Sequence, residues 1–179
     1  MKTPLIGFLA FMLTLVCVTG HAQTSALKKI TLRDKVEILV PEPFKELEEE
    51  ILKFKYPSAS RPTLVYSDDE AKTNVAFNFT QNKASQPEME AVRKSMEASF
   101  RKSFPTATWL GTGVKVVNGR NVGFVEIVTP AMDQKIYNLL FFSDVEGKLL
   151  MGTFNCLEKE RTEWQATAHQ IMNSLTLKK

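Results

Sequence analysis

The chain has 179 residues, of which 44% are hydrophobic and 24% are charged, and its formal net charge at pH 7 is +3. This composition is that of an ordinary globular protein and excludes the disordered and fibrous classes. The near balance of basic and acidic residues also argues against a nucleic-acid partner, because nucleic-acid binders carry a dense basic stripe.

The first 22 residues have the pattern of an export signal. Lys2 supplies a positive start, residues 5–18 form an apolar run, and Gly20-His21-Ala22 offers a cleavage site with small residues at its ends. The run is shorter than the roughly 20 residues that a membrane-spanning helix needs. We therefore expect residues 1–22 to be a signal peptide and residues 23–179 to form one domain. The mature chain is expected to have no membrane span and to be periplasmic or secreted.

The first part of the mature chain predicts two short strands and a short helix. The strands are expected at 29–33 and 36–40, followed by two prolines. A helix is expected over 44–54 because apolar residues recur there at helical spacing. Its predicted buried stripe consists of Phe44, Leu47, Ile51 and Phe54.

The next part predicts a loop and a hairpin. Residues 55–63 form a loop rich in proline and serine. Strands are expected at 64–66 and 73–80, with the acidic run 68–70 as their turn. The same acidic run lacks the spacing and the glycine of a calcium loop, so a turn is the favoured interpretation.

The second half predicts one long helix, four strands and a final helix. Ser85 and Glu88 form a capping-box pattern that opens a helix over 86–103. Asn118-Gly119 is a strong hairpin turn because both residues tolerate positive φ. The predicted strands are 109–117, 121–129, 135–143 and 148–156, and the final helix is 162–175.

The strand around residues 136–142 indicates the layering. It is apolar on both faces, as a central strand is when it is covered on each side. The sequence therefore predicts an α+β fold in which an antiparallel sheet of six to eight strands lies between helices, an α/β/α sandwich.

This order of elements resembles the PsbP-like superfamily over most of the mature chain. The resemblance rests on the long helix, the hairpin at Asn118-Gly119, the stretch Gly123-Phe124-Val125-Glu126, the apolar strand and the final helix with Trp164. The sequence is also similar to uncharacterised exported proteins of Gram-negative bacteria, through the stretches 55–58, 61–63, 81–83 and 153–156. The resemblance implies an envelope protein that binds other proteins, and it carries over no functional residue.

The residue types that carry catalytic or metal chemistry are scarce. His169 is the one histidine after the signal, and its spacing from Trp164 predicts an exposed, ordinary side chain. No metal site, catalytic residue or cofactor is therefore expected. Cys156 is the one mature cysteine, and a buried, inert thiol is favoured over a reactive one. Gly111-Thr112-Gly113 leads into a strand, so we expect a bulge or close packing there rather than a phosphate loop.

Two polar segments are the candidate site. The loop at 55–62 holds two prolines together with a tyrosine and an arginine, types that are enriched at interface hot spots. The segment 81–84 is expected to be a second polar loop that lies near the first at one edge of the sheet. The predicted partner-binding residues are Tyr56, Arg61, Gln81 and Asn82. The alternative is a rigid connector whose tyrosine packs on the core.

The sequence favours an exported, non-enzymatic binding module of the bacterial envelope, a monomer or weak oligomer that binds a protein or peptide. A small-molecule or lipid carrier remains open and requires an apolar pocket of roughly 300 Å³ or more. An envelope enzyme with an unrecognised carboxylate or thiol site also remains open.

Overall fold

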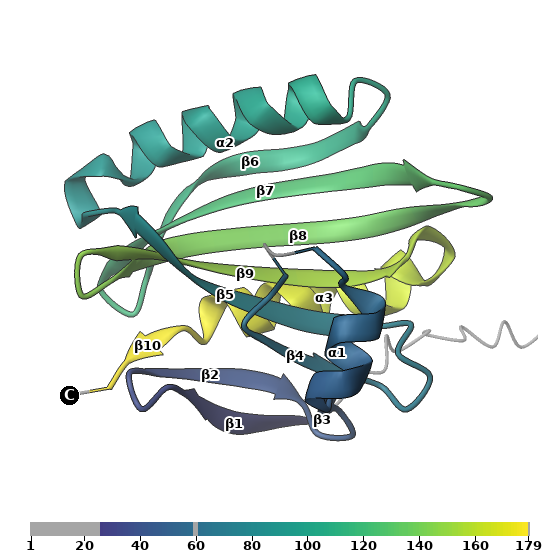
Figure 1. Ribbon diagram of the computed structural model, residues 1–179. Helices are drawn as coiled ribbons and strands as arrows, with labels where there is room; N and C mark the ends of the chain where they lie inside the picture. Colours follow the sequence, from purple (N-terminus) through teal and green to yellow (C-terminus); the bar gives the residue numbers. More distant parts are fainter. Residues whose placement is uncertain (1–25, 59–60, 179) are drawn as a thin grey trace, which may run out of the picture.

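The computed structural model describes residues 26–58 and 61–178. The predicted signal peptide, residues 1–22, lies outside the described residues. Figure 1 shows a sandwich in which a large twisted sheet has helices on both faces. Among the described residues, no helix is long and apolar enough to cross a membrane.

Seven strands form the large antiparallel sheet, in the order β3-β4-β5-β9-β8-β7-β6. They are β3 (Lys45–Glu46), β4 (Leu64–Ser67), β5 (Asn74–Lys83), β6 (Thr108–Val117), β7 (Arg120–Ala131), β8 (Gln134–Val145) and β9 (Lys148–Leu157). This sheet confirms the predicted fold class. Four of its strands, from β6 to β9, follow one another as hairpins.

The first two strands do not join this sheet. They form a separate three-stranded sheet with the end of the chain, in the order β1-β2-β10. Its strands are β1 (Leu27–Leu32), β2 (Val36–Pro41) and β10 (Thr176–Leu177). This small sheet was not predicted, because the two residues of β10 are too short to give a pattern.

The helices divide between the two faces of the large sheet (Figure 1). One face is covered by α1 and α2, and the other by α3 together with the small sheet. The helices are α1 (Glu49–Lys55), α2 (Met89–Ser103) and α3 (Arg161–Asn173), with 3-10 turns η1 (Gln86–Glu88) and η2 (Glu158–Glu160) before α2 and α3. At η1 the Ser85 hydroxyl bonds the Glu88 carboxylate and not a backbone N–H, so the capping box is incomplete.

Strand β8 is the centre of the core, as its two apolar faces predict. Leu139 and Phe141 point into the cluster beneath α3 and the small sheet, and Leu140 and Phe142 point towards α2. Each phenylalanine lies against a glycine of the neighbouring strand. A Cβ added to Gly152 would lie 2.2 Å from the Phe141 ring, and one added to Gly123 would lie 2.2 Å from the Phe142 ring. These contacts are possible only because both positions lack a side chain.

The strand order differs from the order of the strands along the chain. Helix α2 carries the chain from β5 across the sheet to β6 at the far edge, and the chain then returns through β7 and β8 to β9 (Figure 1). Strand β9 therefore pairs with β5, with Asn74 opposite Asn155 and Lys83 opposite Lys148. Hydrophobic periodicity does not report which strands are neighbours, so the sequence could not show this pairing.

The predicted stripe of the first helix is wrong. Phe44 is buried in the main core before the helix begins, whereas Ile51 and Phe54 are 47% and 90% exposed. The residues of α1 that face the sheet are Leu52 and, one turn later, Tyr56. The reason is that Lys45–Glu46 pairs with β4, so the helix starts only at Glu49 and presents a different side.

Candidate functional site

The residues predicted to bind a partner fall at opposite ends of β5. Tyr56 lies beside Asn74, where β5 begins, whereas Gln81 and Asn82 lie inside β5 near its other end. The segment at 81–83 is therefore strand and not loop. At about 3.3 Å per residue, roughly 20 Å separates Asn74 from Gln81. The structure therefore does not bring Tyr56 together with Gln81 and Asn82, and the expectation that the two segments lie near each other is wrong for this tyrosine.

Tyr56 lines a cavity of about 360 Å³, which we call the amide pocket. It lies at the end of α1, over the starts of β5 and β8 and the end of β9. These three ends are adjacent because β9 pairs with both neighbours. The lining residues are Lys55, Tyr56, Ala71, Lys72, Asn74, Gln134, Ile136, Asn155 and Leu157.

Side-chain amides form a row across the strands beneath this pocket. Asn74, Asn155 and Asn138 are opposite one another on β5, β9 and β8. The Asn155 Nδ2 donates to Asn138 Oδ1 at 2.5 Å, and Asn138 Nδ2 donates to Thr129 Oγ1 at 3.1 Å. The row is thus hydrogen-bonded at the β8 end.

Asn74 ends the row with an unsatisfied acceptor. Its side chain is 5% exposed, and its Oδ1 has no hydrogen-bond partner among the described residues. A buried polar atom without a partner costs about 1–3 kcal/mol. Such an acceptor in the wall of a cavity favours a ligand that supplies a hydrogen-bond donor.

Tyr56 both supports the fold and lines the pocket. Its ring packs on the small cluster formed by Leu52, Val65 and Ala76, and this burial raises its pKa. The neighbouring Lys55 Nζ donates to the Ala71 carbonyl, and burial lowers the pKa of Lys55. The connector interpretation and the binding interpretation of this tyrosine are therefore compatible.

Arg61 does not line the pocket. It is half-buried, and its backbone N–H donates to the Ser58 carbonyl at 3.2 Å. Lys53 lowers the pKa of Glu49 at the start of α1, and the charge of Arg61 adds a smaller effect in the same direction. This places the Arg61 guanidinium near the start of α1, whereas the pocket lies at the end of that helix.

The exposed side of α1 extends the site. Ile51 and Phe54 are exposed on this helix, and its last residue, Lys55, already belongs to the pocket wall. Figure 1 shows α1 at the end of the sheet, and no described helix or strand covers its outer side. These two exposed apolar side chains make the outer side of α1 a candidate interaction surface.

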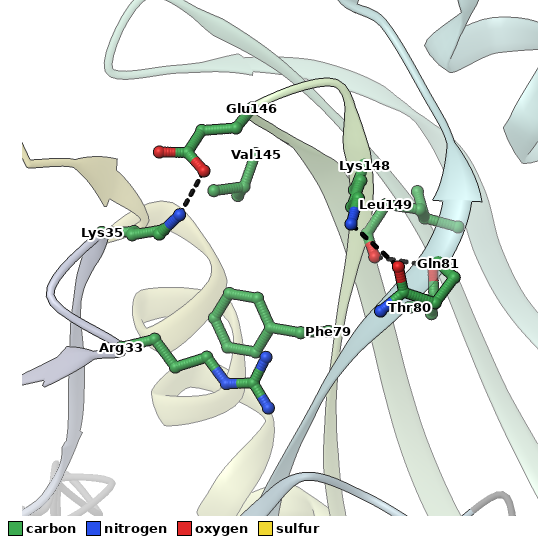
Figure 2. Close-up of a pocket in the computed structure, with 9 residues that line it drawn as sticks. All are labelled: Arg33, Lys35, Phe79, Thr80, Gln81, Val145, Glu146, Lys148 and Leu149. Carbon is green, nitrogen blue, oxygen red and sulfur yellow. Dashed lines mark hydrogen bonds and ion pairs between the residues drawn. The ribbon is translucent and has the colours of Figure 1, made fainter.

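Gln81 lines a second cavity of about 150 Å³ at the opposite end of β5, which Figure 2 shows. Its Oε1 accepts a hydrogen bond from Lys148 Nζ at 2.8 Å. Asn82 is exposed and does not line this cavity, and its backbone N–H donates to Thr80 Oγ1 at 3.2 Å.

The structure also contains a buried charged cluster that sequence reasoning missed. The Glu126 carboxylate on β7 accepts hydrogen bonds from Tyr137 Oη and Gln165 Nε2, both at 2.7 Å. His169 Nε2 lies 3.3 Å from its other oxygen. His169 is 27% exposed and paired, so the predicted exposed and ordinary histidine is wrong. The sequence contained two signals of this cluster. Gln165 and His169 are four residues apart and so share one face of the final helix. Glu126 occupies an inward-facing position of a strand whose other residues are mostly apolar.

This cluster is suited to holding α3 on the sheet rather than to catalysis. Burial by itself raises the pKa of Glu126, but the hydrogen bonds from His169, Tyr137 and Gln165 outweigh it and lower that pKa to about 2. Burial also raises the pKa of Tyr137. A carboxylate that is already ionised and hydrogen-bonded on both oxygens is a poor proton acceptor near neutral pH.

The remaining candidates have structural roles. Cys156 is buried, and this burial raises the pKa of its thiol to about 12, which confirms the predicted buried, inert cysteine. Asp68 accepts the backbone N–H groups of Lys72 and Thr73 at 2.8 and 3.0 Å, as a turn residue does. A bulge precedes Gly111 in β6. No three side chains of the described part of the chain form a metal-ligating group.

Known proteins resemble this chain in fold and not in sequence. No protein-family model matches the sequence, and no curated protein matches it. The solution structure of cyanobacterial PsbP (CyanoP) from Synechocystis sp. PCC 6803 is similar with a TM-score of 0.62 and 14% identity, covering 93% of this chain and 99% of that chain. The crystal structure of LpqN from Mycobacterium tuberculosis is similar with a TM-score of 0.55 and 12% identity. The match covers 80% of this chain and 83% of that chain. The predicted resemblance is thus confirmed at the level of architecture, and the chain has the PsbP-like fold.

Proposed function

We propose that the protein is an exported, non-enzymatic module of the bacterial envelope that binds a protein or peptide at the amide pocket and the outer side of α1. The observation that carries this proposal is the position of Phe54, which is 90% exposed beside a pocket with an unsatisfied amide acceptor. A free-standing aromatic side chain gains most when a partner covers it. The signal peptide predicted for residues 1–22 supports the envelope location.

The pocket has the chemistry that a peptide main chain requires. A peptide presents alternating N–H donors and C=O acceptors, and a side-chain amide can satisfy both. Asn155 and Gln134 offer amides at the pocket wall, and Asn74 offers its unpaired oxygen. An apolar side chain of the partner would then pack on Ile51 and Phe54. Tyr56 in the pocket wall and Arg61 near the start of α1 are further proposed contacts.

The alternatives receive less support. A lipid carrier requires a mostly apolar cavity, whereas three amide side chains and two lysines are among the nine residues that line the amide pocket. The enzyme alternative requires a carboxylate or thiol whose pKa suits catalysis. The pKa of Glu126 is instead lowered to about 2, and burial raises the pKa of Cys156 to about 12. Neither group is prepared for acid–base or nucleophilic chemistry.

The proposal can be tested by placing a photo-crosslinking amino acid at Phe54 in the full chain, in living cells. Val116 is the matched control position, because it is also apolar and 74% exposed but lies on β6 at the far edge of the sheet. We expect one adduct of defined mass from position 54 and none from position 116. Equal labelling at both positions would contradict a specific surface on α1.

The partner recovered in this way then allows a quantitative comparison. Phe54→Ser should weaken its binding by at least about tenfold, as the loss of a hot-spot residue does. Val116→Ser should leave the dissociation constant unchanged. Arg61→Ala tests the proposed contact near the start of α1, and variants at Gln81 and Asn82 test whether the partner reaches the far end of β5. Urea unfolding of each variant checks that the fold is retained.

A further inference from the structure

The second cavity, which we call the turn cleft, lies at the other end of β5 from the amide pocket and is not part of the function proposed above. The turn between β1 and β2, the end of β5 and the turn between β8 and β9 meet there (Figure 2). Its volume is about 150 Å³. The lining residues are Arg33, Lys35, Phe79, Thr80, Gln81, Val145, Glu146, Lys148 and Leu149.

The β1–β2 turn holds Arg33 in a conformation that arginine disfavours. Arg33 and Asp34 have φ of 47° and 56°, and the Lys35 N–H donates to the Leu32 carbonyl at 3.0 Å. This is the left-handed hairpin turn in which glycine and asparagine are usual. A long side chain at such a position costs conformational energy, and strained residues of this kind gather at functional sites. The arginine side chain therefore needs an explanation.

Arg33 has hydrogen-bond donors to offer to a ligand. Its guanidinium carbon lies 4.8 Å from the centroid of the Phe79 ring, a stacked position that leaves the N–H groups at its edge free. It has no carboxylate partner among the described residues. Figure 2 shows the Phe79 ring between this guanidinium and the ion pair of Lys35 with Glu146.

The charges of the cleft are only partly balanced. Lys35 is paired with Glu146, the one carboxylate among the lining residues. Lys148 donates to the neutral Gln81, so its charge, like that of Arg33, has no counter-ion in the cleft. Two uncompensated cations at one cavity favour an anionic ligand. Glu146 would repel that anion, but Lys35 already neutralises its charge.

The floor of the cleft is apolar. Phe79, Val145 and Leu149 form it, and the last two are buried. A cavity of about 150 Å³ has room for an apolar group of up to about the size of benzene on this floor. A bare inorganic anion would leave this floor uncovered, whereas an anion that carries a small apolar group would fill it.

We propose that the turn cleft binds a carboxylate attached to a small apolar group, with Arg33 as the principal donor. The planar guanidinium matches a carboxylate with two parallel hydrogen bonds. The apolar group lies on Phe79 and Leu149, and Lys148 adds positive potential. Two sources have this chemistry, a free short-chain carboxylic acid and the last residue of a peptide that ends in a branched apolar side chain.

The test is a titration of the ¹⁵N-labelled protein followed by its backbone amide shifts. The probes are 3-methylbutanoate, a tripeptide ending in valine with a free carboxylate, and the same tripeptide with a C-terminal amide. We expect both acids to shift the amides of Arg33, Gln81 and Gly147, and the amidated peptide to shift none. Comparable affinity of the two acids identifies a free acid as the source, and tighter binding of the peptide acid identifies a C-terminus.

Two variants make the result specific. Arg33→Asn removes the guanidinium but suits the left-handed turn, so it should remain folded and bind the acids at least about tenfold more weakly. Lys115→Gln is the matched control, because it removes another cation that lies over an aromatic ring, 5.0 Å from the Phe124 centroid on β6. It should bind as the parent does. Unchanged binding by Arg33→Asn, equal binding of the amidated peptide, or displacement of the acid by an equal concentration of phosphate would each overturn the proposal.

Discussion

Glu126 illustrates how this protein tolerates a charge in its interior. A buried carboxylate is unfavourable unless hydrogen bonds replace the water that it loses. Here Tyr137, Gln165 and His169 supply those bonds from two different elements. Because Tyr137 is on β8 and the other two residues are on α3, the carboxylate joins the helix to the sheet at a point where the packing is otherwise apolar.

This arrangement predicts an acid-dependent stability. The pKa of Glu126 falls from its ordinary value of 4.5 to about 2 on folding, because the hydrogen bonds outweigh the effect of burial. Its contribution is therefore present above pH 4.5 and is lost as the pH falls towards 2, by on the order of 2 kcal/mol. Glu126→Gln should remove most of this loss, measured as the free energy of unfolding in urea between pH 5 and pH 2.

The control for this experiment is Glu163→Gln on α3, the helix that the Glu126 cluster contacts, because Glu163 is exposed. It should retain the acid-dependent loss of the parent protein. If Glu126→Gln loses stability over this pH range as steeply as the parent does, the carboxylate is not the group that titrates.

At the scale of the elements, the three central strands depend on glycine. Gly152 on β9 is opposite Phe141, and no Cβ fits between its backbone and that ring. Gly152→Ala should therefore destabilise the protein by about 1–3 kcal/mol, as overpacking of a core does. Gly111→Ala is the matched control, since its Cβ would meet no atom closer than 3.6 Å. Urea denaturation of both variants measures the difference, and equal midpoints would contradict the steric account.

The elements that could be predicted are those with local signals. The turns at Asn118-Gly119 and Glu146-Gly147 contain glycines with positive φ, and the strands on either side of each turn have clear patterns. The first helix could not be placed correctly, because the pairing of Lys45–Glu46 with β4 depends on a contact distant in sequence. The same limit hid β10, whose two residues are a strand only because they meet β2.

The candidate site was predictable in part and for the same reason. Residue type alone singled out Tyr56, which does line a pocket. The loop and Gln81 could not be assigned to separate cavities, since that requires the register of β5 on β9. The importance of Arg33 was also hidden, because nothing in the sequence shows that its turn meets the turn of β8 and β9.

At the scale of the whole molecule, one apolar cluster joins the two sheets. It contains Val36 and Ile38 of the small sheet, Phe77 and Phe154 of the large sheet, and Ile171 of α3. A second cluster lies under α2, on the other side of the large sheet. The residues of β8 alternate between the two clusters, so loss of either one exposes one face of the same strand. We propose that residues 23–179 unfold as one unit.

The two tryptophans can test this cooperativity, because they lie on opposite faces of the sheet. Trp164 packs on the cluster under α3, and Trp109 packs on the cluster under α2. Trp164→Phe leaves Trp109 as the reporter, and Trp109→Phe leaves Trp164. In each variant the fluorescence and circular dichroism midpoints in urea should coincide. A fluorescence midpoint that differs from circular dichroism in either variant would show that the two layers unfold separately.

The pairing of β5 with β9 also determines when the chain can fold. Thr80 Oγ1 donates to the carbonyl of Leu149, 69 residues further along the chain, and the whole of α2 and three strands lie between them. The ends of so long a segment must meet before the sheet can close, and such distant pairings slow folding. A growing or translocating chain therefore has no complete sheet until β9 emerges. Under the export proposed above, this late closure would delay completion of the sheet until most of the chain has crossed the membrane.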